Sequence, residues 1–381
     1  MAYDKVVDSA SLDSKLTQVA DAIRTKGNTS ADLQFPSGFI SAIQAIQTGT
    51  ELQIIVTVTS GATVTATKGS KVVSGTSVNG TCTLTVPEEG EWTVSATLGG
   101  ETSISNTVNF ASSYDISLAF ISTTLNDNSW ENIRKVSDDG QGANYWSVGD
   151  CKEVTLDGKL SALTLSNVTT YVFIIGFNHN SSLEGTNRIH FQLGKTALSD
   201  GTDVCFCDSS YGSPISPTGG FCMNFNSTNT GGWKDSLMRK RICGAEPGGT
   251  AISIFNVISD DLKGALKSVT KYTDNTGGSG STASYVTETT DYFFLLSEYE
   301  VFGSIAYGNT NEANKQAQYD YYSAGNSKIK YNRDETITAA LWWLRSPYSR
   351  NSMSFVNVRY DGEFDYYTAD YSIGFAPGFC V

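Results

Sequence analysis

The sequence is poor in ionisable side chains, and only two of its 381 residues are histidines. Charged residues make up 17% of the chain, and the formal net charge is −13. A chain this acidic repels the phosphate backbone of nucleic acids, so we expect no nucleic acid partner. The scarcity of histidine disfavours a catalytic triad. Neither a Walker-type phosphate loop nor a dinucleotide-binding glycine motif occurs.

Long apolar runs are also missing. No stretch of about twenty apolar residues occurs, so we expect no membrane insertion. Met1–Lys5 leads into no apolar segment, which predicts a protein made in the cytoplasm without a signal peptide. The seven cysteines are scattered and odd in number. Without a secretory signal we expect them to be reduced and mostly buried thiols.

Glycine and tyrosine are abundant, with 36 and 19 residues. This composition favours strands joined by many turns over a helical bundle. The length predicts two or three domains. We therefore expect a multidomain, mostly β chain of the α+β type.

Residues 1–48 are predicted to be helical. Apolar residues recur at helical spacing from Leu12 to Ile23, with Ser11 as the expected N-cap and Gly27 as the end. A Phe-Pro pair then introduces a second short helix. Two short helices bury too little apolar surface to stand alone, so we expect them to join another copy or a larger assembly. A hairpin packed on the rest of the chain is the alternative.

Residues 49–111 show short alternating strands separated by turn signals at near-regular spacing. Leu52 to Val58 is one such strand, and Trp92 is an expected core residue. This pattern is typical of an immunoglobulin-like β-sandwich. Because no acid pair, histidine or nucleophile cluster occurs here, we interpret the module as a spacer.

Residues 112–381 are expected to form one large domain. Apolar residues from Trp130 to Val136 indicate a helix near its start. Residues 274–282 are predicted to form a flexible surface loop because glycine and serine dominate them. The polar segment 312–326 is expected to be exposed as well.

The densest apolar block of the chain lies at Leu341–Pro347. Trp342 and Trp343 must point in opposite directions on a strand, so one should enter the core and the other a second layer or an edge. Arg345 can tie neighbouring backbone segments together through its planar fork of donors. The Asp-Gly pair at 361–362 predicts a hairpin turn, and a buried final strand is expected after it.

A polar, tyrosine-rich stretch lies between this block and the final strand. Tyrosine offers a large contact area at low entropic cost, and serine and asparagine offer adaptable hydrogen bonds. We interpret the stretch as a binding face, against the alternative of an ordinary exposed hairpin. The predicted ligand-binding residues are Tyr348, Arg350, Asn351, Ser354, Asn357, Arg359, Asp361, Asp365, Tyr366, Tyr367, Asp370 and Tyr371.

The block Trp342–Pro347 and the ending Gly374–Phe379 resemble a domain of unknown function common in Firmicutes and their phages. Further segments that look like the same domain are residues 146–150, 176–180, 232–239 and 294–301. The resemblance covers roughly residues 125–381. In layout that family is similar to the C-type-lectin-like variable proteins of diversity-generating retroelements, phage tropism determinants among them. The run from Ser11 to Ile46 resembles the N-terminal segment of prophage tail-tip proteins.

The resemblance implies a C-type-lectin-like ligand-binding domain at residues 112–381 and no catalytic activity. It implies a receptor-binding protein at a phage tail tip, located in the virion, that recognises a bacterial cell-surface protein or glycan. Residues 1–48 would join tail structural proteins or form a homo-oligomer, with a trimer favoured. A bacterial surface adhesin of the same fold, or a carboxylate-dependent glycan hydrolase, are the alternatives. The calcium motifs of sugar-binding lectins are absent, and no metal or cofactor is expected.

The cysteines have a chemical and a structural interpretation. Cys205, Cys207, Cys222 and Cys243 could ligate zinc, but their spacing matches no standard structural site, so buried thiols are favoured. Formylglycine-generating-type oxidases are related in fold to C-type-lectin-like domains and use paired cysteines. Cys380 has no matching partner in the sequence, which disfavours that chemistry.

Three further groups have a functional and a structural interpretation. His179 could act as a base or ligand, but a hydrogen-bonded histidine that shapes a turn is favoured. Glu298 and Glu300 flank Tyr299 on an expected strand and could mimic a glycosidase pair, although such spacing is common on exposed strands. The basic run at 234–241 is interpreted as a solvated helix face or a set of ion-pair partners.

Overall fold

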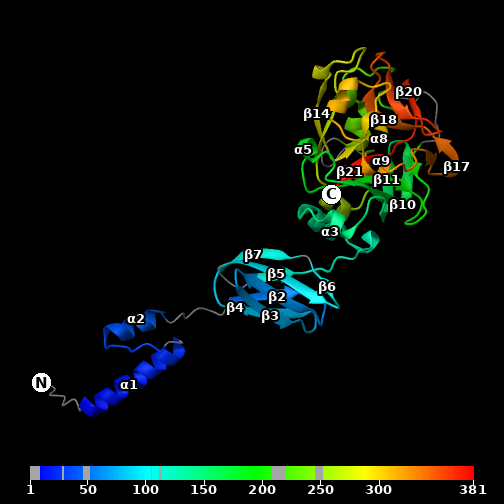
Figure 1. Ribbon diagram of the computed structural model, residues 1–381. Helices are drawn as coiled ribbons and strands as arrows, with labels where there is room; N and C mark the ends of the chain where they lie inside the picture. The colour runs from blue at the N-terminus through cyan, green and yellow to red at the C-terminus, as the bar shows by residue number, and fades with distance from the viewer. Residues whose placement is uncertain are drawn as a thin grey trace. The chain divides into compact units, whose positions relative to one another are not determined.

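The computed structural model describes residues 9–27, 30–45, 52–103, 105–110, 114–207, 220–244 and 252–381. Within them the chain is mostly β, with several separate sheets and an N-terminal helix. The chain divides into two compact units, Met1–Ala119 and Phe120–Val381, called unit 1 and unit 2 below (Figure 1). The prediction about Met1–Lys5 lies outside the described residues.

Two helices begin unit 1, namely α1 (Ser9–Lys26) and α2 (Ser37–Ala45). Ala20, Ile23 and Phe39 form a small shared cluster. The prediction that Ser11 caps α1 is wrong, because the helix already includes Ser9. The predicted end is confirmed, since the Gly27 N–H donates to the Ile23 carbonyl at 2.8 Å.

Two sheets follow in unit 1, with strand orders β4-β1-β8 and β3-β2-β5-β6, and β7 pairs with β5. Their inward residues alternate with exposed ones, as expected for strands with one buried face. Trp92 is fully buried, as predicted, and its indole N–H donates to the Glu88 carbonyl at 3.1 Å. The strands are β1 (Leu52–Thr57), β2 (Thr63–Lys68), β3 (Lys71–Thr76), β4 (Thr81–Val86), β5 (Gly90–Leu98), β6 (Glu101–Thr102), β7 (Asn106–Phe110) and β8 (Tyr114–Ser117).

Unit 2 contains short helices between its strands. They are α3 (Trp130–Asp138), α4 (Gly142–Tyr145), α5 (Ser181–Glu184), α6 (Gly232–Asp235), α7 (Asp260–Ala265), α8 (Glu298–Phe302) and α9 (Asp320–Ser323). The helix predicted near Trp130 is confirmed: the Ser129 hydroxyl caps α3 by accepting from the Asn132 N–H. The Trp130 ring packs against Phe191 and Phe379, so α3 is anchored on the main sheet.

The main sheet of unit 2 has the order β15-β21-β11-β10-β9. Smaller sheets are β12-β16-β17, β13-β14 and β18-β19-β20. The strands are β9 (Cys151–Leu160), β10 (Leu163–Phe177), β11 (Ile189–Lys195), β12 (Val204–Cys205), β13 (Val269–Asp274), β14 (Val286–Asp291), β15 (Phe293–Phe294), β16 (Lys330–Asn332), β17 (Glu335–Ala340), β18 (Trp342–Pro347), β19 (Ser354–Val358), β20 (Phe364–Thr368) and β21 (Gly378–Cys380).

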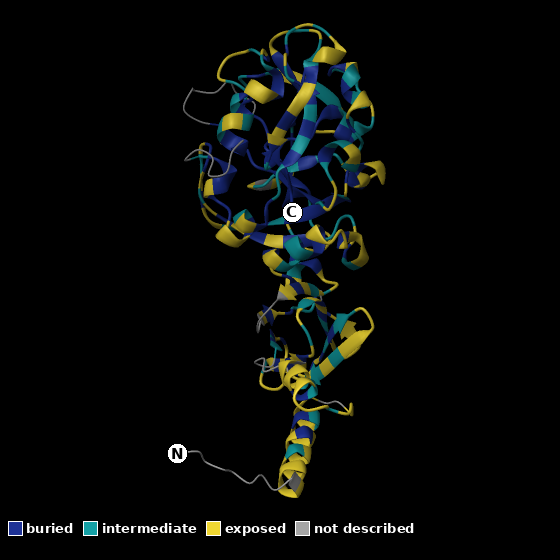
Figure 2. Ribbon diagram, turned by 90° about the vertical axis from the view of Figure 1, so that its left-hand side faces the viewer, coloured by how far each residue is buried: buried dark blue, intermediate teal, exposed yellow. Residues whose placement is uncertain are grey.

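The final strand β21 lies between β15 and β11, so the predicted buried ending is confirmed. Trp342 and Trp343 are both fully buried. Their indole N–H groups donate to the carbonyls of Lys328 and Phe221, which binds the apolar block to two distant segments. Figure 2 shows buried residues filling the interior of unit 2, whereas α1 is mostly exposed. No described helix is long and apolar enough to cross a membrane.

Candidate functional site

The sheet β18-β19-β20 contains or borders all twelve predicted ligand-binding residues. β19 and β20 form the predicted hairpin, and the Gly362 N–H donates to the Arg359 carbonyl in its turn at 2.9 Å. Gly362 has a φ of +86°, a conformation that glycine adopts without strain. Exposed or half-buried members are Arg350, Asn351, Arg359, Asp361, Asp365, Tyr366, Tyr367, Asp370 and Tyr371.

Three of the predicted face residues are buried instead, namely Tyr348, Ser354 and Asn357. β19 is the central strand of its sheet, and all of Ser354–Val358 is buried, so neither of its faces is open to solvent. The alternation of polar and apolar residues in β19 therefore did not predict which side chains are exposed. The Asn357 side-chain amide has no hydrogen-bond partner in the described part of the chain.

The exposed edge strand β20 presents tyrosines on both of its faces. The ring of Tyr366 stacks on that of Tyr348, with centroids 4.2 Å apart. Tyr307 packs edge-on against both rings, at 5.1 Å and 5.6 Å. On the other face Tyr367 contacts Tyr371 at 5.1 Å. We call these five residues, which lie on the two sides of the open β20 edge, the tyrosine face.

Tyr366 and Tyr367 are the most accessible members, with 38% and 36% of their surface exposed. The pKa of Tyr366 is raised above its ordinary value, first by the neighbouring Tyr348 phenol. The Tyr366 phenol is therefore neutral at physiological pH and can both donate and accept hydrogen bonds. The sequence analysis did not identify Tyr307. This residue lies more than forty residues before Ser349, in a loop without a motif.

Glu298 positions Tyr307. The Glu298 carboxylate accepts hydrogen bonds from the backbone N–H groups of Ala306, Tyr307 and Gly308, at 2.8, 3.0 and 2.6 Å. Burial raises the pKa of Glu298, and the three backbone donors oppose that rise. The loop that carries Tyr307 is thus wrapped around a buried acid rather than free in solvent.

The prediction that Glu298 and Glu300 lie on a strand is wrong. Ser297 and Glu300 form a capping box, which starts the helix α8 at Glu298. Both carboxylates are fully buried and bind different protein groups. They do not form an open acid pair of the kind that a glycosidase uses.

Glu300 lies at the centre of a buried ionic network. The Arg345 guanidinium binds both of its carboxylate oxygens, and its Nε donates to the Thr273 hydroxyl at 2.7 Å. Lys271 Nζ lies 3.0 Å from Glu300, 2.7 Å from Glu184 and also contacts the Tyr319 hydroxyl. Burial favours a raised pKa of Glu300, but Arg345 and Lys271 outweigh it and hold that pKa well below its ordinary value.

Glu312 and Asp274 fix the loops beside this ionic network through hydrogen bonds to their carboxylates. Glu312 accepts from the Asp274 N–H at 2.9 Å and from the Ser346 hydroxyl at 2.6 Å. The Asp274 carboxylate accepts from the N–H groups of Thr276 and Gly277, each at 2.9 Å. Burial raises the pKa of Glu312 to about 7. Two predictions are therefore wrong in part: segment 274–282 lies at the surface but is hydrogen-bonded to buried side chains, and 312–326 contains both exposed and fully buried residues.

Asn229 joins the loop at 274–282 to the loop at 348–354. Its side-chain amide nitrogen donates to the carbonyls of Tyr348, Asn351 and Ser354, and its amide oxygen accepts from the Gly278 N–H at 2.7 Å. Asn229 is fully buried. The tyrosine face therefore rests on loops that buried polar side chains hold in place.

One group of three metal-ligating side chains occurs in the described ranges, namely His179, Glu184 and His190. Their ligand atoms lie within 4.8 Å of one another. Lys271 already places its ammonium group 2.7 Å from Glu184, so a metal ion would meet a fixed positive charge. His179 bonds Glu184 and the Ala317 carbonyl, which confirms the prediction of a hydrogen-bonded histidine.

The seven cysteines are all buried and free, as predicted. Cys205 and Cys207 place their sulfur atoms 3.7 Å apart, but the metal-ligating group just described contains neither. Cys380 lies 3.3 Å from His190, and burial raises the pKa of this thiol to about 12. Because the thiolate is the nucleophilic form, this rise disfavours the reactive state of Cys380 at neutral pH.

Comparison with known proteins identifies one family. Residues 222–381, which are 160 of the 381, match the family described as Domain of unknown function (DUF6273). No curated protein matches the chain. The matched segment includes the tyrosine face, Glu298, Glu300 and Arg345. It does not include β9, β10 and β11, which complete the main sheet around β15 and β21.

Proposed function

We propose that this chain is the receptor-binding protein of a phage or prophage tail tip. Its C-type-lectin-like unit recognises a protein or glycan on the bacterial cell surface through the tyrosine face. The observation that carries the proposal is the pair of exposed tyrosines on β20, held by a fully buried ionic and amide framework. Rigid aromatic anchors on a fixed scaffold are the residue types that dominate binding hot spots.

The remaining predictions belong to the same proposal. The C-terminal unit is the ligand-binding domain, the module at residues 49–111 is an immunoglobulin-like spacer, and the protein acts in the virion without catalysis. A subset of the face residues varies between relatives, in the manner of proteins diversified by retroelements. A bacterial surface adhesin would use the same face, and detection of the protein in purified phage particles separates the two.

Replacement of Tyr366 and Tyr367 by alanine tests the tyrosine face. We expect binding of the purified chain to susceptible bacterial cells to weaken at least tenfold, because two exposed aromatic anchors are removed. Surface substitutions of this kind cost little folding free energy, so the thermal unfolding midpoint should barely move. Flow cytometry with labelled protein measures the binding.

Tyr360→Ala is the matched control, because Tyr360 is 58% exposed in the same hairpin but outside the tyrosine face. It should leave binding unchanged. Equal loss from Tyr360→Ala, or full binding by the double variant, would refute the proposal. Release of cleaved glycan from the cells, with turnover that survives the double variant, would instead support the hydrolase.

The N-terminal helices are proposed to oligomerise, with a trimer favoured, and to attach the chain to tail structural proteins. Leu12 and Val19 lie seven residues apart on α1 and are each 47% exposed, and Ile40 and Ile43 on α2 are also exposed. The apolar cluster within the hairpin is small. Exposed apolar residues on both helices indicate a surface that another copy can cover.

Leu12→Asp combined with Val19→Asp should convert a trimer of the full chain into a monomer, because the new charges would be buried without partners. Sedimentation equilibrium measures the mass. Ser14→Asp is the control, since Ser14 is an exposed polar residue of the same helix. A wild-type chain that is monomeric at all concentrations would contradict the oligomer.

A further inference from the structure

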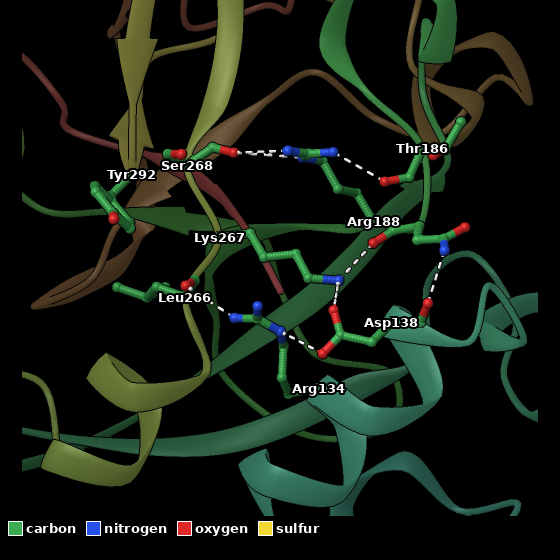
Figure 3. Close-up of a pocket in the computed structure, with 9 residues that line it drawn as sticks. Arg134, Asp138, Thr186, Arg188, Leu266, Lys267, Ser268 and Tyr292 are labelled. Carbon is green, nitrogen blue, oxygen red and sulfur yellow. Dashed lines mark hydrogen bonds and ion pairs between the residues drawn. The ribbon is translucent and has the colours of Figure 1, made fainter. Parts of the chain in front are cut away.

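A hollow of about 400 Å³ lies in unit 2 near one end of the main sheet. Figure 3 shows its charged lining. Arg134 and Asp138 come from α3, Arg188 immediately precedes β11, and Lys267 connects α7 to β13. The Tyr292 ring lies at the side of the hollow. Its volume is within the range typical of small-ligand sites.

The hollow carries an excess of positive charge in an acidic chain. Three cationic side chains face a single carboxylate, whereas the chain as a whole has a net charge of −13. Asp138 accepts from Arg134 Nε at 2.9 Å and from Lys267 Nζ at 2.6 Å. Burial favours a raised pKa of Asp138, but Lys267 and Arg134 outweigh it and lower that pKa. Asp138 is therefore ionised, and two positive charges remain uncompensated.

Both guanidinium groups are held in place and still have donors to offer. Arg134 Nη1 donates to the carbonyls of Ala265 and Leu266, in addition to its bond to Asp138. Arg188 donates to the carbonyls of Thr186 and Ser268. Each group makes three hydrogen bonds with described residues, out of five N–H donors. Two donors of each arginine are left for a ligand.

We propose that this hollow binds the phosphate group of a small phosphomonoester. Arginine forks match phosphate oxygens in a bidentate manner, and a side chain already fixed by backbone carbonyls loses little entropy on binding. A phosphomonoester carries a charge of about −1.5 to −2 at neutral pH, which matches the excess of two positive charges. Tyr292 lies beside the hollow and can contact the group that bears the phosphate.

The site is separate from the tyrosine face. In Figure 1, α3 and β20 lie at opposite ends of unit 2. None of the residues that line the hollow belongs to the sheet β18-β19-β20. The phosphate site therefore does not rest on the proposed function. A chain with Tyr366→Ala and Tyr367→Ala should bind phosphomonoesters as well as the unaltered chain does.

Isothermal titration of the full chain with inorganic phosphate and with glycerol 3-phosphate tests the site. We expect saturable binding with a dissociation constant in the millimolar range or tighter. Dimethyl phosphate, a diester, and acetate carry only one negative charge, so each should bind at least tenfold more weakly. Arg188→Gln should weaken glycerol 3-phosphate binding about tenfold, and added salt should weaken it as well.

Lys263→Gln is the matched control, because it removes one positive charge from α7 outside the hollow. It should change affinity less than twofold. Arg188→Lys keeps the charge and removes the fork, so it should still bind more weakly than the unaltered chain. Circular dichroism and thermal unfolding establish that each variant is folded. Absence of saturable binding, or equal affinity in folded Arg188→Gln, would overturn the proposal.

Discussion

Replacement of Arg345 by methionine is expected to destabilise unit 2 by about 3–5 kcal/mol, the usual cost of leaving a buried charge without its partner. Arg345 is fully buried and binds both carboxylate oxygens of Glu300. Methionine fills part of the volume but leaves Glu300 with Lys271 as its remaining cationic partner among the described residues. The carbonyl of Leu295 also loses a donor. A loss of this size is a large fraction of the stability of a typical domain.

Urea unfolding followed by tryptophan fluorescence measures the loss. Five of the six tryptophans lie in unit 2, so the signal reports mainly on that unit. Arg359→Met is the matched control, because Arg359 pairs with Asp361 in the exposed turn of the same sheet, where an ion pair contributes little. Addition of Glu300→Leu to Arg345→Met should recover part of the loss, since it removes the buried carboxylate that has lost its guanidinium partner. Equal stability of the two methionine variants would contradict the role of the network.

Local signals in the sequence predicted several parts of the fold. The Asp-Gly pair at 361–362 identified the β19–β20 hairpin, because Gly362 adopts the positive φ that its turn requires. The helical spacing from Trp130 to Val136 identified α3. The prediction that Arg345 ties backbone segments together holds for the Leu295 carbonyl. The signals for the hairpin and for α3 lie within a few residues of the structures that they specify, whereas the partner of Arg345 lies 50 residues away.

The supports of the tyrosine face could not be predicted in this way. Arg345 meets Glu300 across 45 residues, and Asn229 meets the carbonyl of Ser354 across 125. Such buried polar residues follow no apolar periodicity, so segments 274–282 and 312–326 looked like exposed loops. Tyr307 was not identified for the same reason, because its position depends on a hydrogen bond to the buried Glu298. Polar side chains were predicted to lie on the surface. In this fold they can be buried because they form hydrogen bonds and ion pairs with one another.

The candidate face itself was predicted in part. Composition alone indicated the tyrosine-rich hairpin, and most of its twelve residues are accessible. Tyr348, Ser354 and Asn357 were assigned to the surface because they are polar or amphipathic. Their burial depends on the strand order β18-β19-β20, which places β19 in the centre of its sheet. Strand order is a property of long-range pairing, and a single sequence does not reveal it.

The pH dependence of stability is the second large effect, and it centres on Glu312. Burial raises the pKa of this carboxyl from 4.5 to about 7 in the folded chain. Between these pH values the folded chain holds a proton that the unfolded chain releases. The contribution of Glu312 to the free energy of unfolding is present in full below pH 4.5 and is lost as the pH rises to 7. The loss amounts to roughly 3 kcal/mol, at 1.36 kcal/mol for each unit of pKa shift.

His190 titrates in the same range with the opposite sign. Burial lowers the pKa of His190 well below 6.5, so only the unfolded chain takes up this proton as the pH falls. Stability from His190 is therefore lost below about pH 6.5. The two groups partly cancel in the unaltered chain, and its pH profile alone does not identify either of them.

Glu312→Gln separates the two contributions. The amide keeps an oxygen for the Asp274 N–H and presents its nitrogen to the Ser346 hydroxyl, which can accept. We expect the stability of the variant relative to the unaltered chain to rise by roughly 3 kcal/mol between pH 5 and pH 8. Urea unfolding at each pH measures it. Glu363→Gln, an exposed change in the same unit, should show no such rise. A flat difference for Glu312→Gln would mean that Glu312 is ionised throughout and that the buried network accommodates its charge.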